Sequence, residues 1–316
     1  MPILFKPISR RQCLSSLLYL SSSYLFGPSL LNTLARASSP KNSPQTTGFM
    51  VIGKGQSPGY PIPELVRAVF DSIGGVGKFI SAGDVVAIKP NISWARTPDL
   101  AATTNPEILK AVIELCFEAG AKKVRIADHT IHDPRRCFAL TGAGEVAKKT
   151  GAELVYPRSS LMRKMRIRGR RIGGWPVLRP LVEADKVINI PIAKHHSLSG
   201  LTLGMKNWIG GVGGRRWALH QDIHQSIVDL ARFFKPTITL IDAIRIMTSN
   251  GPSGGSSKYV ATKNVLFLSN DPVAADAAAA RLFGKDPKSI GFIRLGQEQG
   301  LGTYNLSDLP VRQVTV

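Results

Sequence analysis

The chain carries six histidines, and all of them fall between residues 129 and 224. A neutral imidazole can accept a proton near neutral pH, and a lysine ammonium group in a partly dry cleft can neutralise a carboxylate or a phosphate. Lysine and histidine stand together at Lys194 and His196, with Lys206 close behind and His129 earlier in the chain. These four residues are the predicted catalytic groups, and the chemistry they predict is acid–base work on a small anion.

Polar side chains also follow the predicted strands at the points where those strands end. Lys89 and Asn91 follow one strand, Asp128 follows the next, and Asp242 follows a later one. Ligands of open parallel sheets bind beyond the carboxyl ends of the strands, because loops from several strands meet there. We therefore predict that these four residues and Asn207 bind the ligand. The alternative is that strand ends are polar simply because they are exposed.

Two further histidines are spaced for metal binding. His220 and His224 are four residues apart in a helix predicted over 219–234, so they would share one helical face at the ~5–6 Å separation of helical neighbours. Such a pair can hold one divalent metal ion, although solvated or capped histidines have the same spacing. The chain has too few and too scattered cysteines for a four-thiolate iron–sulfur cluster or zinc site, namely Cys13, Cys116 and Cys137.

An α/β fold must position these residues. Short β-branched runs alternate with helix-period segments from Phe49 onward, which is typical of a mostly parallel sheet flanked by helices. The predicted strands cover 84–88, 123–127, 153–156, 186–190, 237–241 and 264–268. The predicted helices cover 62–73, 106–119, 139–150, 176–184, 219–234 and 272–283. Residues 163–172 interrupt the alternation and predict a basic β-hairpin insertion with its turn at Gly169.

Composition and charge narrow the function classes. With 43% hydrophobic residues the chain is predicted to fold as a globule rather than to stay disordered. Its formal net charge of +20 favours anionic partners. Six lysines and arginines crowd between Arg163 and Arg171 without an acidic neighbour, which is typical of a solvated basic face. Nucleic-acid binding is not expected, because no recognition motif or aromatic stacking array accompanies the charge.

A glycine-rich segment adds a second candidate for anion binding. Residues 204–216 combine flexible backbone, free amide donors and three cations, and such a segment can wrap around an anion. A plain mobile loop is the alternative, because the segment has neither the P-loop spacing nor the dinucleotide-binding fingerprint.

The first 37 residues resemble a secretion signal of the twin-arginine type. Arg10 and Arg11 precede a Ser-rich, moderately apolar stretch that ends in Ala35-Arg36-Ala37. We expect cleavage after Ala37, then a linker over 38–47, then a single α/β domain over 48–316 that could divide into two sub-lobes. Retention as a membrane anchor is the alternative, although serines, Gly27 and Pro28 dilute the apolar run that a spanning helix needs.

Export by this route has consequences for the mature protein. The expected partner is the twin-arginine export machinery, and the expected location is the periplasm or another extracytoplasmic space, with no membrane span left after cleavage. In an oxidising compartment Cys116 and Cys137 could form a disulfide. Because Cys116 lies in an apolar helical pattern, two buried thiols are the alternative.

Several short motifs together resemble the domain-of-unknown-function family 362. They are Lys89-Pro90-Asn91, residues 191–200, residues 201–207, Asp242-Ala243, Gly251-Pro252 and residues 271–276. The resemblance spans roughly 51–283. Ile192 stands where relatives often have a basic residue, and the chain has none of the cysteines of the ferredoxin module that many relatives carry. A distant likeness in organisation to nickel-pincer lactate racemases suggests, by analogy, chemistry on a small carboxylate with paired Lys and His groups.

Three alternative functions are therefore considered. The first is an exported enzyme that acts on a small anionic substrate by Lys/His acid–base chemistry, with or without a divalent metal. In this enzyme Asp242 or Asp128 would orient an imidazole or hold a metal. The second is a periplasmic carrier that binds an anion or metal without turnover. The third is a basic surface protein that binds envelope polymers or nucleic acid through Arg163–Arg171.

Overall fold

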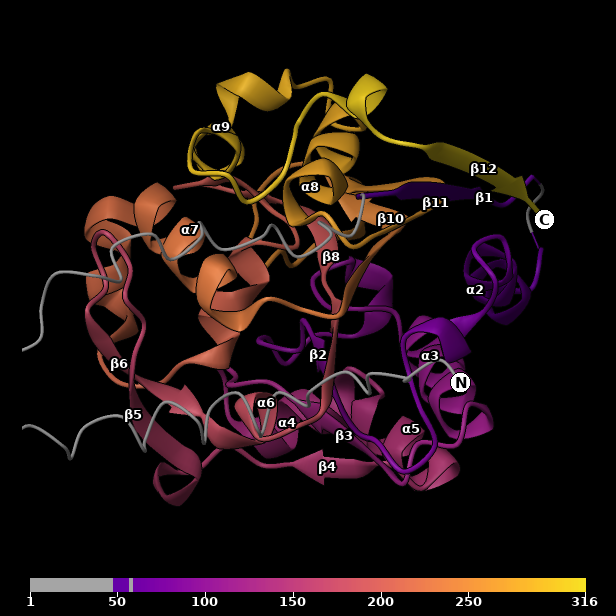
Figure 1. Cartoon of the computed structure of the whole chain (residues 1–316), viewed down its shortest axis with the longest axis horizontal. Helices are drawn as coiled ribbons and strands as arrows, with labels where there is room; N and C mark the ends of the chain where they lie inside the picture. Colours follow the sequence, from indigo (N-terminus) through magenta and orange to yellow (C-terminus); the bar gives the residue numbers. More distant parts are fainter. Residues whose placement is uncertain (1–47, 57–58) are drawn as a thin grey trace, which may run out of the picture. The chain divides into compact units, whose positions relative to one another are not determined.

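The computed structural model describes residues 48–56 and 59–316. The predicted signal peptide over 1–37 and the predicted linker over 38–47 lie outside the described residues. Residues Gly48–Val316 form one compact unit. Its centre is a ten-stranded sheet with helices on both faces, so the predicted α/β class with a mostly parallel sheet is confirmed (Figure 1).

The main path of the sheet runs in the order β12-β1-β11-β10-β7-β2-β3-β4, and β8 and β9 extend it from β10. The strands from β10 to β4 pair in parallel, whereas β11 is antiparallel to both β1 and β10. The strands are β1 (Met50–Lys54), β2 (Val85–Pro90), β3 (Lys123–Ala127), β4 (Glu153–Val155), β5 (Met162–Arg166), β6 (Gly174–Leu178), β7 (Lys186–Ile190), β8 (Ile192–His196), β9 (Gly200–Thr202), β10 (Ile238–Met247), β11 (Val260–Ser269) and β12 (Val311–Thr315).

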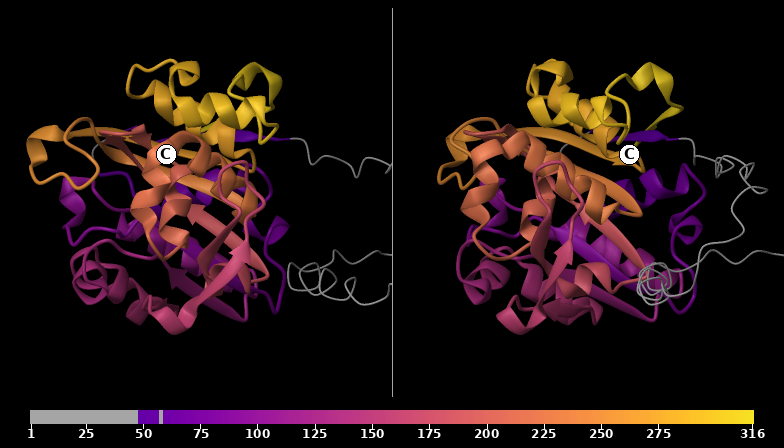
Figure 2. Two further views of the ribbon diagram at one scale, coloured as in Figure 1. Left: turned by 90° about the vertical axis from the view of Figure 1, so that its left-hand side faces the viewer. Right: turned by 60° about the vertical axis from the view of Figure 1, so that its left-hand side comes forward.

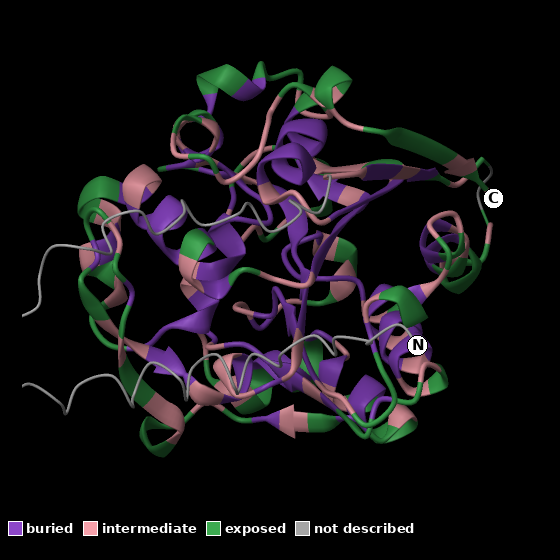
Figure 3. Ribbon diagram, in the orientation of Figure 1, coloured by how far each residue is buried: buried purple, intermediate pink, exposed green. Residues whose placement is uncertain are grey.

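Two layers of helices cover the sheet. The helices are α2 (Ile62–Asp71), α3 (Pro106–Glu118), α4 (Pro134–Leu140), α5 (Ala143–Thr150), α6 (Arg179–Val182), α7 (Ile223–Phe234), α8 (Pro272–Arg281) and α9 (Gly291–Glu298). Side chains of α2 to α5 pack with one face of the strands, including Val86 and Ile88, and those of α6 to α9 pack with the other, including Ala87. Successive residues of a strand point to opposite faces, so β2 is buried on both sides (Figure 3). Figure 2 shows the molecule from two further directions.

Two predicted helices are wrong in part. The helix predicted over 139–150 is broken at Gly142, whose φ of +79° is left-handed and cannot continue a helix. The helix predicted over 176–184 is confined to α6, because residues 174–178 form strand β6 instead. Strand β6 pairs with β5, and the indole of Trp175 donates to the carbonyl of Gly213 at 2.8 Å. The pairing with β5 and the contact with Gly213 have overridden the local helical pattern.

The basic hairpin is present but larger than predicted. Its strands are β5 and β6, and the connection runs over 167–173. Asp229 of α7 holds that connection, because its carboxylate accepts hydrogen bonds from the backbone amides of Arg170, Arg171 and Ile172 at 2.8–3.0 Å. The six basic side chains between Arg163 and Arg171 are exposed.

Candidate functional site

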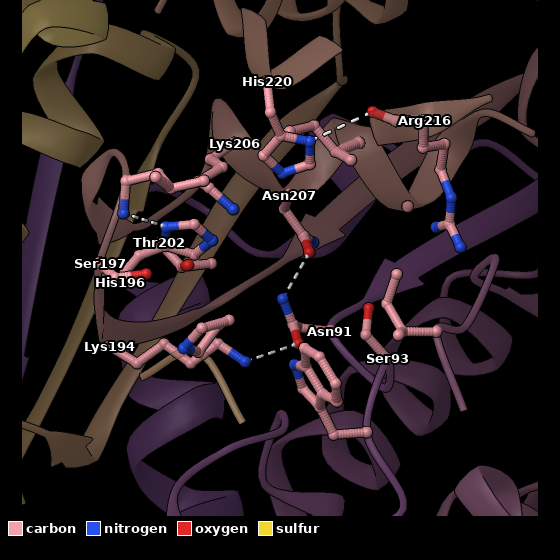
Figure 4. A pocket seen from close by; sticks show the side chains of 16 residues that line it. Asn91, Ser93, Lys194, His196, Ser197, Thr202, Lys206, Asn207, Arg216 and His220 are labelled. Atoms are coloured by element: carbon pink, nitrogen blue, oxygen red, sulfur yellow. Dashed lines mark hydrogen bonds between the residues drawn. The ribbon is translucent and has the colours of Figure 1, made fainter. Parts of the chain in front are cut away.

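A cavity of about 340 Å³ lies where β2 and β7 end. Asn91 follows β2 directly, and β8, which follows β7, contributes two more lining residues. The predicted site residues that line the cavity are Asn91, Lys194, His196, Lys206, Asn207 and His220 (Figure 4). No Asp or Glu of the described residues lines it, so its charged groups are cationic.

The β8–β9 hairpin presents three of the lining side chains. Lys194 and His196 are two residues apart on β8, so both side chains point to the same side of the strand. Thr202 of β9 pairs with Lys194, and Gly200, whose φ is +77°, pairs with His196 at the turn. The hydroxyl of Thr202 is buried and has no hydrogen-bond partner among the described residues. A polar ligand atom would satisfy it.

Lys206 stands on a rigid backbone segment. The buried carboxylate of Asp276, in α8, accepts hydrogen bonds from the amides of Gly204 and Met205 at 2.6 and 3.0 Å. The amide side chain of Asn189 donates to the carbonyl of Gly204 at 2.9 Å. The backbone of Gly204 and Met205 is therefore fixed just before the 3₁₀ helix Lys206–Gly211.

The side chain of Lys206 is only 8% exposed and has no hydrogen-bond or ion-pair partner among the described residues. Burial lowers the pKa of its ammonium group to about 7. Lys194 also lines the cavity, and its ammonium group donates to Asn91 Oδ1 at 3.2 Å and to the carbonyl of Ala102. Burial, followed by repulsion from Lys206, lowers the pKa of Lys194 well below its usual range.

The two histidines of the cavity are held in opposite tautomers. His196 Nδ1 accepts hydrogen bonds from the backbone amides of Leu198 and Ser199 at 3.1 and 3.3 Å, so its proton must sit on Nε2. His220 Nδ1 lies 3.2 Å from the carbonyl of Arg216, to which it can only donate, so in the neutral ring its Nε2 is an acceptor. That nitrogen faces Lys206 and Asn207 in Figure 4. The cavity thus holds one imidazole donor and one imidazole acceptor.

His196 is poorly placed to act as the base that the sequence suggested. Burial, Lys206 and Lys194 lower its pKa to about 2, so the ring is neutral at physiological pH. Its free lone pair is already used by backbone amides, which leaves Nε2–H to donate. Sequence reasoning placed His220 only as a metal ligand, and its acceptor role depends on the Arg216 carbonyl.

A buried polar network centred on Asn207 supports the cavity wall. Asn207 Oδ1 accepts from Lys89 Nζ at 3.2 Å and from Asn91 Nδ2 at 3.1 Å, and its Nδ2 donates to Asn189 Oδ1 at 2.9 Å. Lys89 in turn lies 2.7 Å from Asp128 Oδ1, and both side chains are fully buried. Lys89 and Asp128 therefore support the wall as an ion pair rather than line the cavity.

Asp242 and His129 also lie away from the cavity surface. Asp242 is buried and accepts hydrogen bonds from the amides of Asn105 and Ile244 at 2.8 and 3.1 Å, and burial raises its pKa to about 6. Its carboxylate thus fixes the start of α3, not an imidazole. His129 is bound through its amide to the carbonyl of Gly210 at 2.7 Å, and burial lowers its pKa to about 4.

The structure separates the roles of His220 and His224. Helix α7 begins at Ile223, so His220 lies before it in a 3₁₀ helix, Arg216–Asp222, and the two rings do not share the face of one α-helix. His224 packs against Phe292 of α9 with ring centroids 6.2 Å apart and does not line the cavity. Residues 48–56 and 59–316 contain no cluster of three or more His, Cys, Asp or Glu that could hold a metal ion.

Sequence reasoning missed Arg216 and Thr202 as lining residues. Arg216 donates to the carbonyls of His129 and Thr130 at 2.7 and 2.8 Å and so holds the loop after β3 against the cavity. Its signal was its place in the glycine-rich segment 204–216. Thr202 carried no signal in the sequence beyond its position near Lys206.

The structure also describes the two cysteines of the α/β domain and the lengths of its helices. Cys116 and Cys137 are both buried free thiols. Burial raises the pKa of Cys116 to about 12, so it is an inert thiol. Within the described part of the chain, no helix has both the length and the apolar character to cross a membrane.

The chain is similar in sequence to one curated protein and in structure to two solved proteins described here. It is 28% identical over 244 residues, 75% of this chain and 74% of the relative, to thylakoid-associated protein sll1697 of Synechocystis sp.. The lactate racemase apoprotein of Thermoanaerobacterium thermosaccharolyticum is 14% identical, with a TM-score of 0.47, over 74% of this chain and 56% of its own. A structural-genomics target protein of Thermotoga maritima is 12% identical, with a TM-score of 0.45, over 73% and 61%.

This chain covers less than two thirds of the length of each of the two solved structures. The family model described as "Domain of unknown function (DUF362)" matches residues 86–281, which include every side chain described above as lining the cavity. The resemblance seen in the short motifs is thus confirmed, and the chain belongs to the DUF362 family.

Proposed function

We propose that this protein is an enzyme that binds a small organic anion in the cavity and transfers a proton to or from it. The anion is inferred from the charges of the wall. Lys194, Lys206 and Arg216 line the cavity without an acidic residue beside them there, and Lys206 has no partner among the described residues. A carboxylate would restore the ion pairing that burial removes from Lys206.

The observation that carries proton transfer is the opposite tautomers of the two cavity histidines. His220 Nε2 can accept a proton from the bound anion, while its Nδ1–H stays bonded to the Arg216 carbonyl. His196 Nε2–H can donate a hydrogen bond to an oxygen that gains charge during the transfer. Lys206 holds the negative end of the substrate. The roles of the two histidines thus follow from their own backbone contacts.

The alternative is a carrier without turnover. The low pKa of His196 favours a carrier, because His196 then does not serve as a second proton acceptor beside His220. A carrier needs only the cations and the hydrogen-bond donors of the wall. Both functions predict anion binding, and they differ in whether the bound molecule is chemically changed.

The test uses protein purified from its exporting cell. Compounds that co-purify are identified by mass spectrometry, and they and a panel of 2-hydroxy and 2-amino acids are incubated with the protein in D₂O. NMR then follows the exchange of substrate protons for deuterium. We expect His220→Gln to lower exchange by a factor of about 10²–10⁴ while anion binding stays within a few-fold. Lys206→Met should remove binding, and Lys122→Met, an exposed lysine, is the matched control.

The outcomes separate the two functions. Binding without exchange of any compound assigns the protein as a carrier. Folded wild-type protein that binds neither the co-purified compounds nor any carboxylate of the panel refutes the anion site itself. Exchange that survives unchanged in His220→Gln refutes its role as the proton acceptor.

We also propose that the protein works outside the cytoplasm, on the basis of its first 37 residues. The supporting observation is the pair Arg10-Arg11 before the apolar stretch that ends at Ala37. N-terminal sequencing of the protein from fractionated cells tests this, because an extracytoplasmic product beginning at Ser38 is expected. An intact N-terminus on cytoplasmic protein would contradict it.

A further inference from the structure

Apolar side chains stand at the opening of the cavity, whereas the cations lie deeper. Ile131 and Leu198 line it and are 51% and 62% exposed, while Lys206 is 8% exposed. Trp94, Ile209 and Pro252 are partly buried and complete the apolar part of the wall. We name Ile131 and Leu198, with these three residues, the apolar rim.

The exposure of the rim costs free energy in the empty protein. Large apolar side chains such as Leu198 gain by leaving water, at roughly 25 cal/mol per Å² of apolar surface. Ile131 comes from the loop after β3 and Leu198 from the turn between β8 and β9, so two distant segments place apolar side chains at one opening. Exposed apolar groups that surround a concave site mark a binding surface.

The size of the cavity exceeds what a carboxylate group needs. About 340 Å³ lies within the ~300–1,000 Å³ of pockets that enclose organic ligands. The cations and the unpartnered hydroxyl of Thr202 account for a charged end of the ligand. The five residues of the apolar rim have no polar side-chain atom except the indole N–H of Trp94, so apolar atoms of a ligand fit against them.

We propose that the ligand is an amphiphilic anion, whose charged end lies against Lys206 and Lys194 and whose apolar chain or ring contacts the rim at Ile131 and Leu198. This inference rests on the proposed anion site and specifies the class of its substrate. Carboxylates with a hydrocarbon chain belong to this class, and small hydrophilic acids do not.

The test is the affinity of the purified protein for acetate, butyrate, hexanoate and octanoate, measured by isothermal titration calorimetry in a buffer without other carboxylates. We expect the affinity to rise about fourfold for each methylene that becomes buried, which is ~0.8 kcal/mol per CH₂ at ~1.4 kcal/mol per tenfold. Leu198→Ser and Ile131→Ser should lower the affinity for octanoate and reduce this dependence on chain length. Leu140→Ser, at an exposed leucine of α4 away from the cavity, is the matched control and should change neither.

Each outcome is informative. Equal affinity for all four acids refutes the amphiphilic ligand and leaves the anion site intact. Absence of binding by all four, with the protein folded, refutes the anion site on which the inference rests. If the dependence on chain length survives in both rim variants, the apolar contact lies elsewhere and the inference is wrong. If chain length has no effect but vesicles of anionic lipid bind wild type and not Leu198→Ser, the rim faces a membrane surface instead.

Discussion

Raising the pH from about 6 to about 9 removes the proton of Lys206 in the free protein. We expect this loss of charge to weaken anion binding. The pKa of Lys206 is lowered to about 7, because its ammonium group is buried without an acidic partner. Below that pH the cation is present and attracts the anion. Above it the free protein holds a neutral amine, so binding must take up a proton.

The magnitude follows from Coulomb's law. A carboxylate about 4 Å from the Lys206 nitrogen gains ~4 kcal/mol at an effective dielectric constant of ~20. This equals ~3 pH units, so the bound complex keeps its proton to about pH 10. The affinity therefore falls about tenfold per pH unit above pH 7, and it is about 100-fold lower at pH 9 than at pH 6.

Calorimetry in two cationic buffers of different ionisation enthalpy measures this directly, because the difference in heat gives the number of protons taken up. We expect about one proton at about pH 8.5 and almost none at about pH 6. Lys206→Arg should keep binding and abolish the pH dependence, since guanidinium stays charged. Lys206→Met should abolish both. A flat affinity from about pH 6 to about pH 9 with no proton uptake would refute the reasoning.

The free protein offers an independent check on the same group. The unfolded chain holds its lysine proton up to about 10.5, whereas the folded chain releases it near 7. Between these pH values the unfolded state binds more protons, so the contribution of Lys206 to the free energy of unfolding rises with pH. Lys206→Met should lose this rise, as chemical denaturation at several pH values would show.

Three further predictions concern the supports of the site. Lys89→Met leaves the buried carboxylate of Asp128 without its ion-pair partner and should lower the free energy of unfolding by about 3–5 kcal/mol. In a double-mutant cycle followed by chemical denaturation, Lys89→Met combined with Asp128→Asn should lower it by less than the sum of the two single substitutions. Asp276→Ala removes both acceptors of the Gly204–Met205 amides and should lower stability by about 2–4 kcal/mol and weaken acetate binding, while Asp276→Asn keeps one acceptor and should show smaller losses. Gly210→Ala would put its Cβ 2.1 Å from Asp128 Oδ1 and 2.9 Å from Lys89 Nζ, so a lower melting temperature is expected, and an unchanged one would show that the ion pair can shift freely.

Strong local signals made much of the fold predictable. Strands β3 and β7 have the bounds that their β-branched runs predict. Helix α3 begins where Asn105 and Pro106 predict it, and Asn105 accepts a hydrogen bond from the amide of Glu107 at 2.9 Å. Strands β1, β6, β8, β9 and β12 were not predicted. Short strands depend on their partners for stability more than on their own residues.

The site could be predicted only in part. The rule that ligands bind at strand ends selected Asn91, which lines the cavity, and Lys194, His196 and Lys206, which were selected for their acid–base chemistry, line it too. The same rule also selected Asp242, but β10 continues to Met247, so Asp242 lies inside that strand and accepts hydrogen bonds from backbone amides. No sequence pattern distinguishes these two environments.

The sequence by itself determined that lysines, histidines and asparagines follow several strands of one α/β domain, because residue type, periodicity and the order of strands are written along the chain. Only the tertiary structure decided what each group can do. The charge of Lys206 depends on burial, and the tautomers of His196 and His220 depend on the backbone groups that their Nδ1 atoms meet. Such properties arise from neighbours in space, and a linear pattern does not contain them.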